Sequence, residues 1–461
     1  MDTRELFNPD LIRRYDVAGP RYTSYPTAAD FHTGISPERY AAWAQASNAA
    51  QGPLSLYFHI PFCARVCFYC ACNKIITNNR SRAQPYLDRL YREIALQGDL
   101  YDRSRPVEQL HWGGGTPTFL TTEQMQELMA VTGEHFRLLD DDCGEYSIEI
   151  DPREVRDDTL AALRALGFNR LSLGVQDFDP RVQKAVNRIQ PESMTFGVIE
   201  EARRTGFRSV SLDLIYGLPL QSEASFATTV DKVLEVTPDR LSVFNYAHMP
   251  ERFKTQRQIN ADELPSPDEK LRILQRTTEQ LLAAGYVYIG MDHFARPDDE
   301  LAVAQREGTL YRNFQGYSTH ADCDLVAMGV TSIGKVSHHY IQNRRDIEEY
   351  YADLDAGRLP VFRGYELDDD DVLRRQVINE LICHFHLDFA AIESTFDIVF
   401  RDYFATELAE LAAMERDGLL ALDGEGIRVH PAGRLLIRNI CMVFDRYLRA
   451  RQPGQTFSRV I

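Results

Sequence analysis

The sequence predicts an α/β fold in which six βα units form an open or incomplete barrel, with an N-terminal arm before it and a mainly helical C-terminal domain after it. Three patterns indicate this fold. Six short apolar runs alternate with helix-like segments, apolar and polar side chains alternate along each run, and long amphipathic segments replace this pattern after about residue 365. A doubly wound open sheet remains an alternative, because local patterns do not determine strand order.

The N-terminal arm is expected at residues 1–52. Its aromatic and polar stretch 21–27 has neither helical nor strand periodicity, which favours an extended conformation. The barrel domain is expected at residues 53–320. Its strands are predicted at 54–60, 109–113, 146–150, 170–175, 209–214 and 240–245, and helices between them at segments such as 121–136 and 158–166.

Side-chain alternation separates two faces of the predicted strands, because residues two apart in a strand point to the same side. One face is apolar, as at Leu54, Leu56 and Phe58, and is expected to pack against the helices. The other face is polar and suits a barrel lumen. Polar residues gather toward the C-terminal ends of the strands, where βα-barrel enzymes build their active sites. The site candidates at these ends are His59, Glu149, Gln176 and Asp213.

A connecting segment, 321–364, is expected to lead into the C-terminal domain at 365–461. Helices are predicted at 372–385, 400–414 and 433–448, with a hairpin around 423–426. We interpret this domain as a cover over the barrel. Helices followed by a hairpin also occur in winged-helix modules, but fold-level likeness says little about function, and the acidic charge disfavours DNA.

The 461 residues have an ordinary globular composition, with 44% hydrophobic residues and a formal net charge of −17. This charge would repel phosphate backbones, so no nucleic-acid role is expected. The first residues lack the organisation of a secretory signal, and no apolar run approaches the length of a membrane span. We therefore expect a cytoplasmic protein without membrane insertion.

Eight cysteines are too few for a disulfide scaffold in a chain of this length, and four of them fall between residues 63 and 72. Cys63, Cys67 and Cys70 have C-x3-C-x2-C spacing just after the first predicted strand. Three thiolates can each hold one iron of a 4Fe–4S cluster, which leaves the fourth iron open to the amino and carboxylate groups of S-adenosylmethionine (SAM). A zinc site is the alternative, with Cys72 or a histidine as the fourth ligand, because thiolates also suit zinc.

The Gly-Gly-Gly-Thr-Pro stretch at 113–117 follows the second predicted strand, and glycines let a ligand approach the backbone closely. Such a turn is weak evidence by itself, but beside the cysteine loop it indicates a cofactor site. Glu149 could accept a hydrogen bond from the methionine amino group, and Asp213 could bind a ribose hydroxyl. The alternative is that both are solvated carboxylates at strand ends, and that His59 is a buried core histidine.

On these motifs the chain resembles the bacterial oxygen-independent coproporphyrinogen III oxidases, radical SAM enzymes of haem biosynthesis. The resemblance extends over essentially the whole chain and includes the stretches 21–27, 57–63, 67–74, 111–117, 147–153, 174–178, 213–219, 290–295, 313–317 and 438–441. It implies an incomplete (βα)6 radical-SAM barrel. It also implies a reaction in which a 5′-deoxyadenosyl radical removes a hydrogen atom from a substrate propionate. Two propionates of coproporphyrinogen III would become vinyl groups, giving protoporphyrinogen IX.

The resemblance implies site residues as well. Cys63, Cys67 and Cys70 would hold one 4Fe–4S cluster, and two SAM molecules would bind side by side. The residues implied for the first SAM are Tyr57, Tyr69, Gly114, Glu149 and Ile333. Those implied for the second SAM are Gly115, Thr116, Gln176, Arg188, Asp213 and Ala247. Those implied for catalysis or the substrate are Tyr57, His59, Cys72 and Gln315, where Cys72 matches a family cysteine that does not bind the cluster.

The partners implied are coproporphyrinogen III, a reduced flavodoxin or similar electron donor, and an unknown electron acceptor, and a monomer is expected. Two other functions stay open. A haem-binding chaperone of the same superfamily would keep the three cluster cysteines, although Cys72 and the stretch 21–27 favour the oxidase. A simple iron–sulfur electron carrier would leave the barrel and its polar strand ends unexplained. The sequence does not show which arginines bind the propionates.

Overall fold

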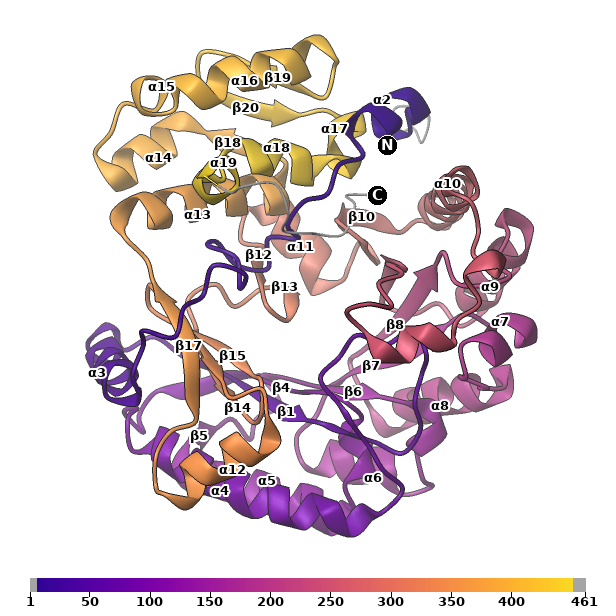
Figure 1. The fold of residues 1–461 in the computed structure, drawn as a ribbon, viewed down its shortest axis with the longest axis vertical. Coiled ribbons are helices and arrows are strands. Elements are labelled where there is room, and N and C mark those ends of the chain that lie inside the picture. Colours follow the sequence, from indigo (N-terminus) through magenta and orange to yellow (C-terminus); the bar gives the residue numbers. More distant parts are fainter. Residues whose placement is uncertain (1–5, 451–461) are drawn as a thin grey trace.

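The computed structural model describes residues 6–450, which form one long curved sheet with helices along its outer side and a mainly helical domain opposite its middle (Figure 1). Seven strands at the centre of the sheet run parallel to one another. They are β1 Leu54–Ile60, β4 Pro106–Gly114, β6 Glu145–Ile150, β7 Arg170–Gln176, β8 Ser209–Tyr216, β9 Arg240–Asn245 and β14 Asp324–Met328.

The strand order identifies the architecture. From β1 through β4, β6, β7 and β8 to β9, neighbours in the sheet follow chain order without a reversal, whereas a doubly wound sheet reverses at a switch point. The edge strands β10 (Val287–Gly290) and β17 (Val361–Glu366) do not pair with each other in the described part of the chain, so the barrel stays open. The predicted incomplete barrel of six βα units is confirmed, and the doubly wound alternative is wrong.

The sheet continues past residue 320, where the barrel domain was expected to end. β14 pairs in parallel with β1, and the antiparallel strands β15 (Ile333–Val336), β16 (His339–Asn343) and β17 extend the same sheet. Helix α12 (Ile347–Asp355) connects β16 to β17. At the other edge, β10 and β11 (His293–Ala295) add an antiparallel pair beside β9. The segment 321–364, expected only as a connection, is therefore a structural part of the sheet.

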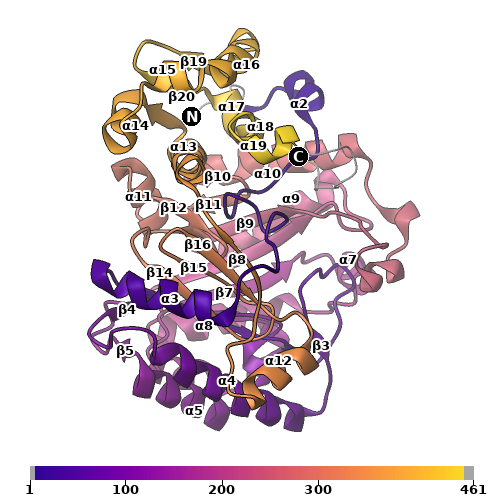
Figure 2. The same cartoon turned by 60° about the vertical axis from the view of Figure 1, so that its left-hand side comes forward.

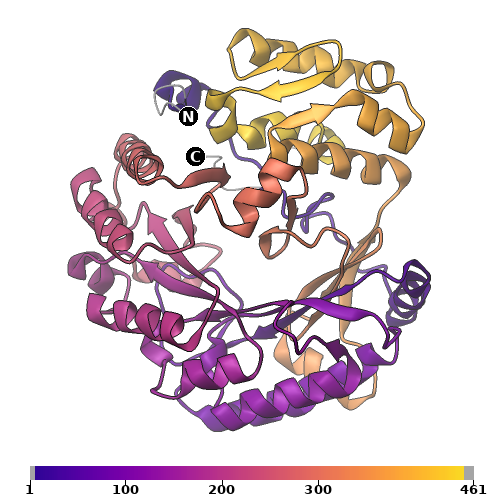
Figure 3. The same cartoon turned by 180° about the vertical axis from the view of Figure 1, so that it is seen from behind.

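Helices cover the outer face of the sheet, as the view from behind shows (Figure 3). The predicted helices 121–136 and 158–166 correspond to α5 and α6 below. Thr121 starts α5 with a capping box, in which its side chain accepts from the Gln124 N–H and the Gln124 side chain accepts from the Thr121 N–H. The helices on this side and at its ends are α4 Ala83–Gly98, α5 Thr122–His135, α6 Thr159–Ala165, α7 Pro180–Ala185, α8 Glu192–Thr205, α9 Glu223–Glu235, α10 Pro267–Ala283 and α11 Glu300–Glu307.

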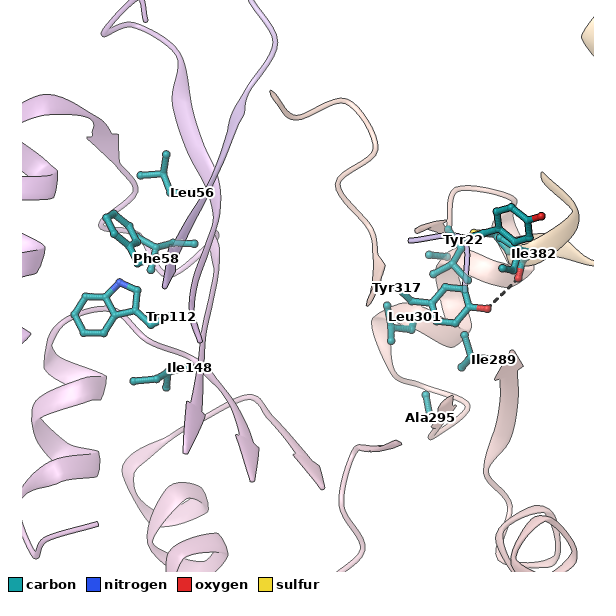
Figure 4. Close-up of a cluster of buried hydrophobic side chains, with 14 of the residues drawn as sticks. Tyr22, Leu56, Phe58, Trp112, Ile148, Ile289, Ala295, Leu301, Tyr317 and Ile382 are labelled. Carbon is teal, nitrogen blue, oxygen red and sulfur yellow. Dashed lines mark hydrogen bonds between the residues drawn. The ribbon is translucent and has the colours of Figure 1, made fainter. Parts of the chain in front are cut away.

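The apolar face of the strands packs against these helices, as the alternation predicts. Leu56, Phe58, Trp112 and Ile148 project from this face and are fully buried (Figure 4). The rings of Phe58 and Trp112 meet edge to face at 6.3 Å. Full burial of such a side chain contributes about 1.5–3 kcal/mol, so this layer holds the parallel strands in register and leaves their polar face for the site.

The N-terminal arm is extended only in part. Two helices, α2 (Pro9–Tyr15) and α3 (Pro37–Ser47), flank an irregular segment that contains residues 21–27. Each helix begins with a proline after a capping side chain, Asn8 or Ser36, which is a common start for a short helix. Figure 2 shows the arm passing from α2, beside the C-terminal domain, to α3, near the edge of the sheet. The expectation of a fully extended arm is therefore corrected.

The C-terminal domain contains the predicted hairpin, but the helix predicted at 433–448 is broken into three. Asp445 causes one break, because its carboxylate accepts from the N–H groups of Tyr447 and Leu448 and starts a new helix. No helix among residues 6–450 has the length and apolarity needed to cross a membrane. The elements are α13 Asp369–His384, β18 His386–Asp388, α14 Phe389–Phe396, α15 Phe400–Tyr403, α16 Ala405–Arg416, β19 Leu420–Leu422, β20 Gly426–Val429, α17 Pro431–Leu435, α18 Ile437–Val443 and α19 Arg446–Ala450.

Candidate active site

The three clustered cysteines lie on the loop that follows β1. Cys63 ends the short strand β2 (Phe62–Cys63), which pairs with β3 (Ile75–Ile76). The rest of the loop is held from two sides. The Phe68 N–H donates to the Val186 carbonyl at 3.0 Å, and the Thr255 hydroxyl donates to the Cys70 carbonyl at 3.2 Å. Segments that follow β7 and β9 thus fix residues 64–74, which form no helix or strand.

Two arginines point at the sulfur of Cys67. Arg153 donates to it at 3.3 Å and Arg188 at 3.5 Å, while the Thr116 hydroxyl lies 3.7 Å from the sulfur of Cys63. Asp151 forms ion pairs with both arginines, at 2.6 Å and 3.0 Å. Burial tends to raise the pKa of Asp151, but Arg188 and Arg153 outweigh it and lower the pKa to about 2. The cysteine loop therefore faces fixed positive charge that suits bound thiolates.

The described residues contain one group of side chains spaced as the ligands of a single metal ion are, and it lies away from the cysteine loop. The ligand atoms around one zinc ion lie roughly 3–4 Å apart, because each zinc–ligand bond is about 2.0–2.3 Å long. Within residues 6–450, the only His, Cys, Asp or Glu side chains that bring three ligand atoms within 4.8 Å of one another are Glu108, His320 and Cys323. These three lie at the start of β4 and just before β14, away from the cysteine loop. The three cysteines of the loop do not form such a group.

The glycines after β4 bring the backbone against the cysteine loop. The Thr116 N–H donates to the Phe62 carbonyl at 2.8 Å. A β carbon on Gly115 would lie only 2.7 Å from the same carbonyl oxygen, so a larger residue does not fit there. Gly114 has a φ of +110°, which favours glycine, and its N–H donates to the Glu149 carboxylate at 3.0 Å.

Glu149 lies at the end of β6 in a cavity of about 270 Å³ that Tyr57, His59, Gln315 and Ile333 also line. His111 approaches its carboxylate at 3.6 Å. Burial tends to raise the pKa of Glu149, but His111 and the Gly114 N–H outweigh it and hold the pKa below its ordinary value. An ionised carboxylate at this place suits a cationic amino group.

Contacts between aromatic rings hold part of the lining of this cavity in place. The Tyr57 ring stacks on His111 with centroids 5.8 Å apart, and its hydroxyl lies 3.2 Å from Nδ1 of His59. The other ring nitrogen of His59 lies 3.0 Å from the Asn73 carbonyl. His59 is therefore buried with both ring nitrogens partnered, and it still faces the cavity.

A second cavity, of about 210 Å³, adjoins the first, and His111, Glu149 and Gln315 line both. Asp213 on β8 lies in the second cavity and accepts from the Ser172 hydroxyl at 3.2 Å. Burial and the nearby charge of Glu149 raise the pKa of Asp213 to about 6. The polar faces of the strands, which side-chain alternation predicted, therefore line these two adjoining cavities.

Gln176 is the last residue of β7, and Arg188 follows α7 and contacts Cys67 of the cysteine loop. Gln176 has a φ of +65° at an irregular step in the pairing of β7 with β8. Its side-chain oxygen is buried without a hydrogen-bond donor among the described residues. Arg188 donates to the Gly174 carbonyl at 2.6 Å as well as to Cys67. The unpartnered Gln176 oxygen marks a place where a ligand can donate.

Comparisons with known proteins identify the family of this chain. Family models for the Radical SAM superfamily and the HemN C-terminal domain match residues 57–233 and 367–436. The oxygen-independent coproporphyrinogen III oxidase of Pseudomonas aeruginosa is 59% identical over 455 residues, with 99% of each chain covered. This chain belongs to the oxygen-independent coproporphyrinogen III oxidase family. The relative from Escherichia coli is 52% identical over 452 residues, with 98% of each chain covered.

A solved structure of a coproporphyrinogen III oxidase from Escherichia coli, described as a radical SAM enzyme, has a TM-score of 0.91 and 50% identity, covering 96% of this chain and 99% of that one. The oxidase family implies one 4Fe–4S cluster and SAM as cofactors. The residues present fit both groups. The three clustered thiols, of which Cys67 has two guanidinium donors, suit a cluster, and the Gly114–Glu149 pair, with its ionised carboxylate, suits a cationic amino group.

Cys72, Tyr69 and Ala247, which the resemblance also implies, line neither of the two cavities. Cys72 is exposed, and its carbonyl accepts from Lys74 at 3.4 Å. The Tyr69 ring packs against a buried apolar group, and its carbonyl accepts from Gln256 at 3.0 Å. Ala247 is half-buried in the loop after β9. Their roles stay predictions.

Sequence reasoning left three polar side chains of the oxidase site out of the candidates. His111 shares the polar parity of the strands, and that signal could have included it. Asp151 and Arg153 follow the end of β6, so their position at a strand end could also have been predicted. The contact of Arg153 with Cys67 could not, because it joins residues 86 positions apart.

Proposed function

We propose that this protein converts two propionates of coproporphyrinogen III to vinyl groups without oxygen, giving protoporphyrinogen IX in haem biosynthesis. One observation carries the proposal: in a member of this family, the loop of Cys63, Cys67 and Cys70 packs against the glycine turn whose Gly114 N–H holds the ionised Glu149 in a polar cavity. A haem carrier or a simple electron carrier has no need for that juxtaposition.

Cys63, Cys67 and Cys70 would hold the cluster, and Tyr57, Gly114, Glu149 and Ile333 would hold one SAM. Bound together, these groups would supply a hydrogen-abstracting radical after one-electron reduction. The chain's own contribution is orientation. Glu149 stays ionised and is held by the Gly114 N–H, and Tyr57 is held between His111 and His59.

A second SAM is proposed at Gly115, Thr116, Gln176, Arg188, Asp213 and Ala247. The second cavity beside the first and the unpartnered oxygen of Gln176 support this proposal. Asp213, with a pKa of about 6, exchanges its proton near neutral pH and can either donate to or accept from a ribose hydroxyl.

Each reacting propionate would lose one hydrogen atom, carbon dioxide and one electron, and the carbon–carbon single bond would become a vinyl double bond. The hydrogen atom goes to the adenosyl carbon, and the electron goes to a one-electron acceptor outside the chain. Reduced flavodoxin or a similar carrier is proposed as the electron donor, and the chain is proposed to act as a monomer. Gln315, which lines both cavities, is proposed to lie on the substrate side.

The experiment is turnover by the protein reconstituted with iron and sulfide under anaerobic conditions, then given reductant, SAM and coproporphyrinogen III. Mass spectrometry is expected to show a product that has lost two carboxyl groups, and a sample without reductant is expected to show none. Stoichiometric haem binding without any decarboxylation would instead support the chaperone. SAM left intact under reducing conditions would support the electron carrier.

A further inference from the structure

Three cations lie close together where the N-terminal arm, the hairpin of β12 (Tyr311–Asn313) and β13 (Gly316–Ser318), and the C-terminal domain meet. Arg312 is on β12, Lys335 is on β15 and Arg375 is on α13. Lys335 donates to the Tyr311 hydroxyl at 3.1 Å, and Arg375 donates to the His338 ring at 2.9 Å. Throughout residues 6–450, no carboxylate oxygen lies within 4.0 Å of the charged nitrogens of these three side chains.

Several hydrogen-bond donors in this group lack an acceptor in the described part of the chain. Arg312 is 7% exposed, and its Nε and Nη1 groups are buried without a partner. Nη1 of Arg375 and the hydroxyl of Ser24 are buried without a partner as well. Leaving a buried guanidinium unpaired is costly, whereas a carboxylate gives it strong charge-assisted hydrogen bonds.

These donors surround one small cavity of about 20 Å³, which Ser24, Arg312, Arg375, Asn379 and Tyr340 line. None of the side chains that line it is acidic. The volume suffices for one small polar group and not for a whole cofactor. The cavity therefore suits the end of an acidic side arm.

One layer of aromatic rings separates this small cavity from the two cavities of the active site. The Arg312 guanidinium stacks on Tyr317 at 4.7 Å, and Tyr317 lines the second cavity. The Tyr317 hydroxyl donates to the Ile382 carbonyl at 3.0 Å, which holds the ring in place (Figure 4). Tyr340 packs edge to face on Phe314 at 5.7 Å, and Phe314 lines the first cavity.

We propose that Arg312 and Arg375 bind a propionate carboxylate of the porphyrinogen, with Ser24 donating a further hydrogen bond and Lys335 adding positive charge. This inference rests on the proposed function, because coproporphyrinogen III carries propionates beyond the two that react. A site for an unreactive carboxylate orients the ring so that another propionate faces the cofactor cavities. It also requires the arm, the barrel and the C-terminal domain to be assembled together, since each supplies one of the contacts.

The electrostatics of the group support an anion at this place. Burial and the charge of Arg375 lower the pKa of Lys335 below its ordinary value. Like charges that are buried together repel one another, and a carboxylate between them replaces that repulsion with attraction. In a chain with a net charge of −17, a local cationic group also attracts an acidic ligand.

The test compares coproporphyrin III, the stable oxidised form of the substrate, with its tetramethyl ester, which keeps the ring and lacks the charges. The anaerobically reconstituted protein is titrated with each porphyrin, and binding is followed by porphyrin fluorescence. Arg312→Gln and Arg375→Gln are expected to weaken binding of the acid by about tenfold and to leave binding of the ester unchanged. Arg312→Lys is expected to restore part of the binding of the acid.

The matched control is Arg401→Gln, which removes an exposed arginine that also stacks on an aromatic ring, Phe389, at 5.5 Å. It is expected to bind the acid as the unaltered protein does. Iron content and melting temperature show whether each variant has folded. Equal weakening of acid and ester binding in Arg312→Gln would overturn the inference, and so would unchanged binding of the acid. Failure of the proposed function would be seen separately, as no decarboxylation of coproporphyrinogen III by the unaltered protein.

Discussion

Arg153 donates a hydrogen bond to the sulfur of Cys67 at 3.3 Å while Asp151 holds the same guanidinium at 2.6 Å. Hydrogen bonds and positive charge at a cluster sulfur stabilise the reduced cluster, which carries the larger negative charge. Arg153→Met should therefore lower the midpoint potential of the reconstituted cluster, by tens of millivolts, in a redox titration followed by EPR. Arg156→Met, which removes a guanidinium that donates to the Leu120 carbonyl instead, should shift it much less. Equal shifts would mean that overall charge, and not the contact with Cys67, sets the potential.

Replacing a cluster cysteine should abolish reductive cleavage of SAM. Cys67 is buried and accepts from two arginines, and a serine hydroxyl is a poor ligand for iron, so Cys67→Ser should lose both the cluster EPR signal and 5′-deoxyadenosine formation. Cys143 is exposed in a loop before β6, so Cys143→Ser should keep nearly full activity. Comparable losses in the two variants would refute the assignment of the cluster site.

Glycine at position 115 should be required for both stability and cluster retention. A β carbon there would lie 2.7 Å from backbone atoms of the cysteine loop, and relieving that clash costs about 1–3 kcal/mol. Gly115→Ala should therefore lower the melting temperature and the bound iron. Gly197→Ala is the control, because nothing lies within 4 Å of a β carbon at that helical position, and it should raise stability slightly. Normal iron content in Gly115→Ala would contradict the close approach.

Buried Glu93 should make stability fall as pH rises. Burial raises its pKa to about 7, although Tyr350, Asn343 and the Gly329 N–H donate to it. Between the unfolded pKa, near 4.5, and the folded pKa, the folded state holds a proton that the unfolded state has lost. Its contribution is full below pH 4.5 and is lost as pH rises through 7, by roughly 3 kcal/mol in total.

Glu93→Gln should remove this dependence. Melting temperatures of the unaltered protein should fall relative to those of Glu93→Gln between pH 5 and pH 8, roughly the range that this titration spans. Glu200→Gln, which alters an exposed carboxylate on α8, should run parallel to the unaltered protein. A constant difference between Glu93→Gln and the unaltered protein across this range would show that Glu93 does not titrate there.

The parts of the fold that depend on local patterns could be predicted from the sequence. The strand predicted at 54–60 is β1, and the alternation of Tyr57 and His59 with Leu56 and Phe58 correctly separated the cavity lining from the core. β14 was not predicted, because its five residues form an ordinary buried run whose partner, β1, lies some 270 positions earlier. Pairing over such a distance leaves no local signal.

The residues of the site also fall into those that a local motif predicts and those that no local motif predicts. The spacing of the three cysteines indicated their role, because one loop carries all of them. The ion pair of Asp151 with Arg188 joins the end of β6 to the segment after α7, and the group of Arg312, Lys335 and Arg375 draws on β12, β15 and α13. Residues brought together from distant segments have no common motif, so only the folded chain shows them as a unit.

The most direct test of the account is whether one iron of the cluster is free to bind SAM. The measurement is ENDOR spectroscopy of the reduced, anaerobically reconstituted protein with SAM labelled with ¹⁵N at its amino group. The account predicts a coupling between that nitrogen and the cluster, which is lost in Glu149→Gln if this carboxylate positions the amino group. A cluster whose four irons are all bound by the protein, with no coupling to labelled SAM, would contradict it.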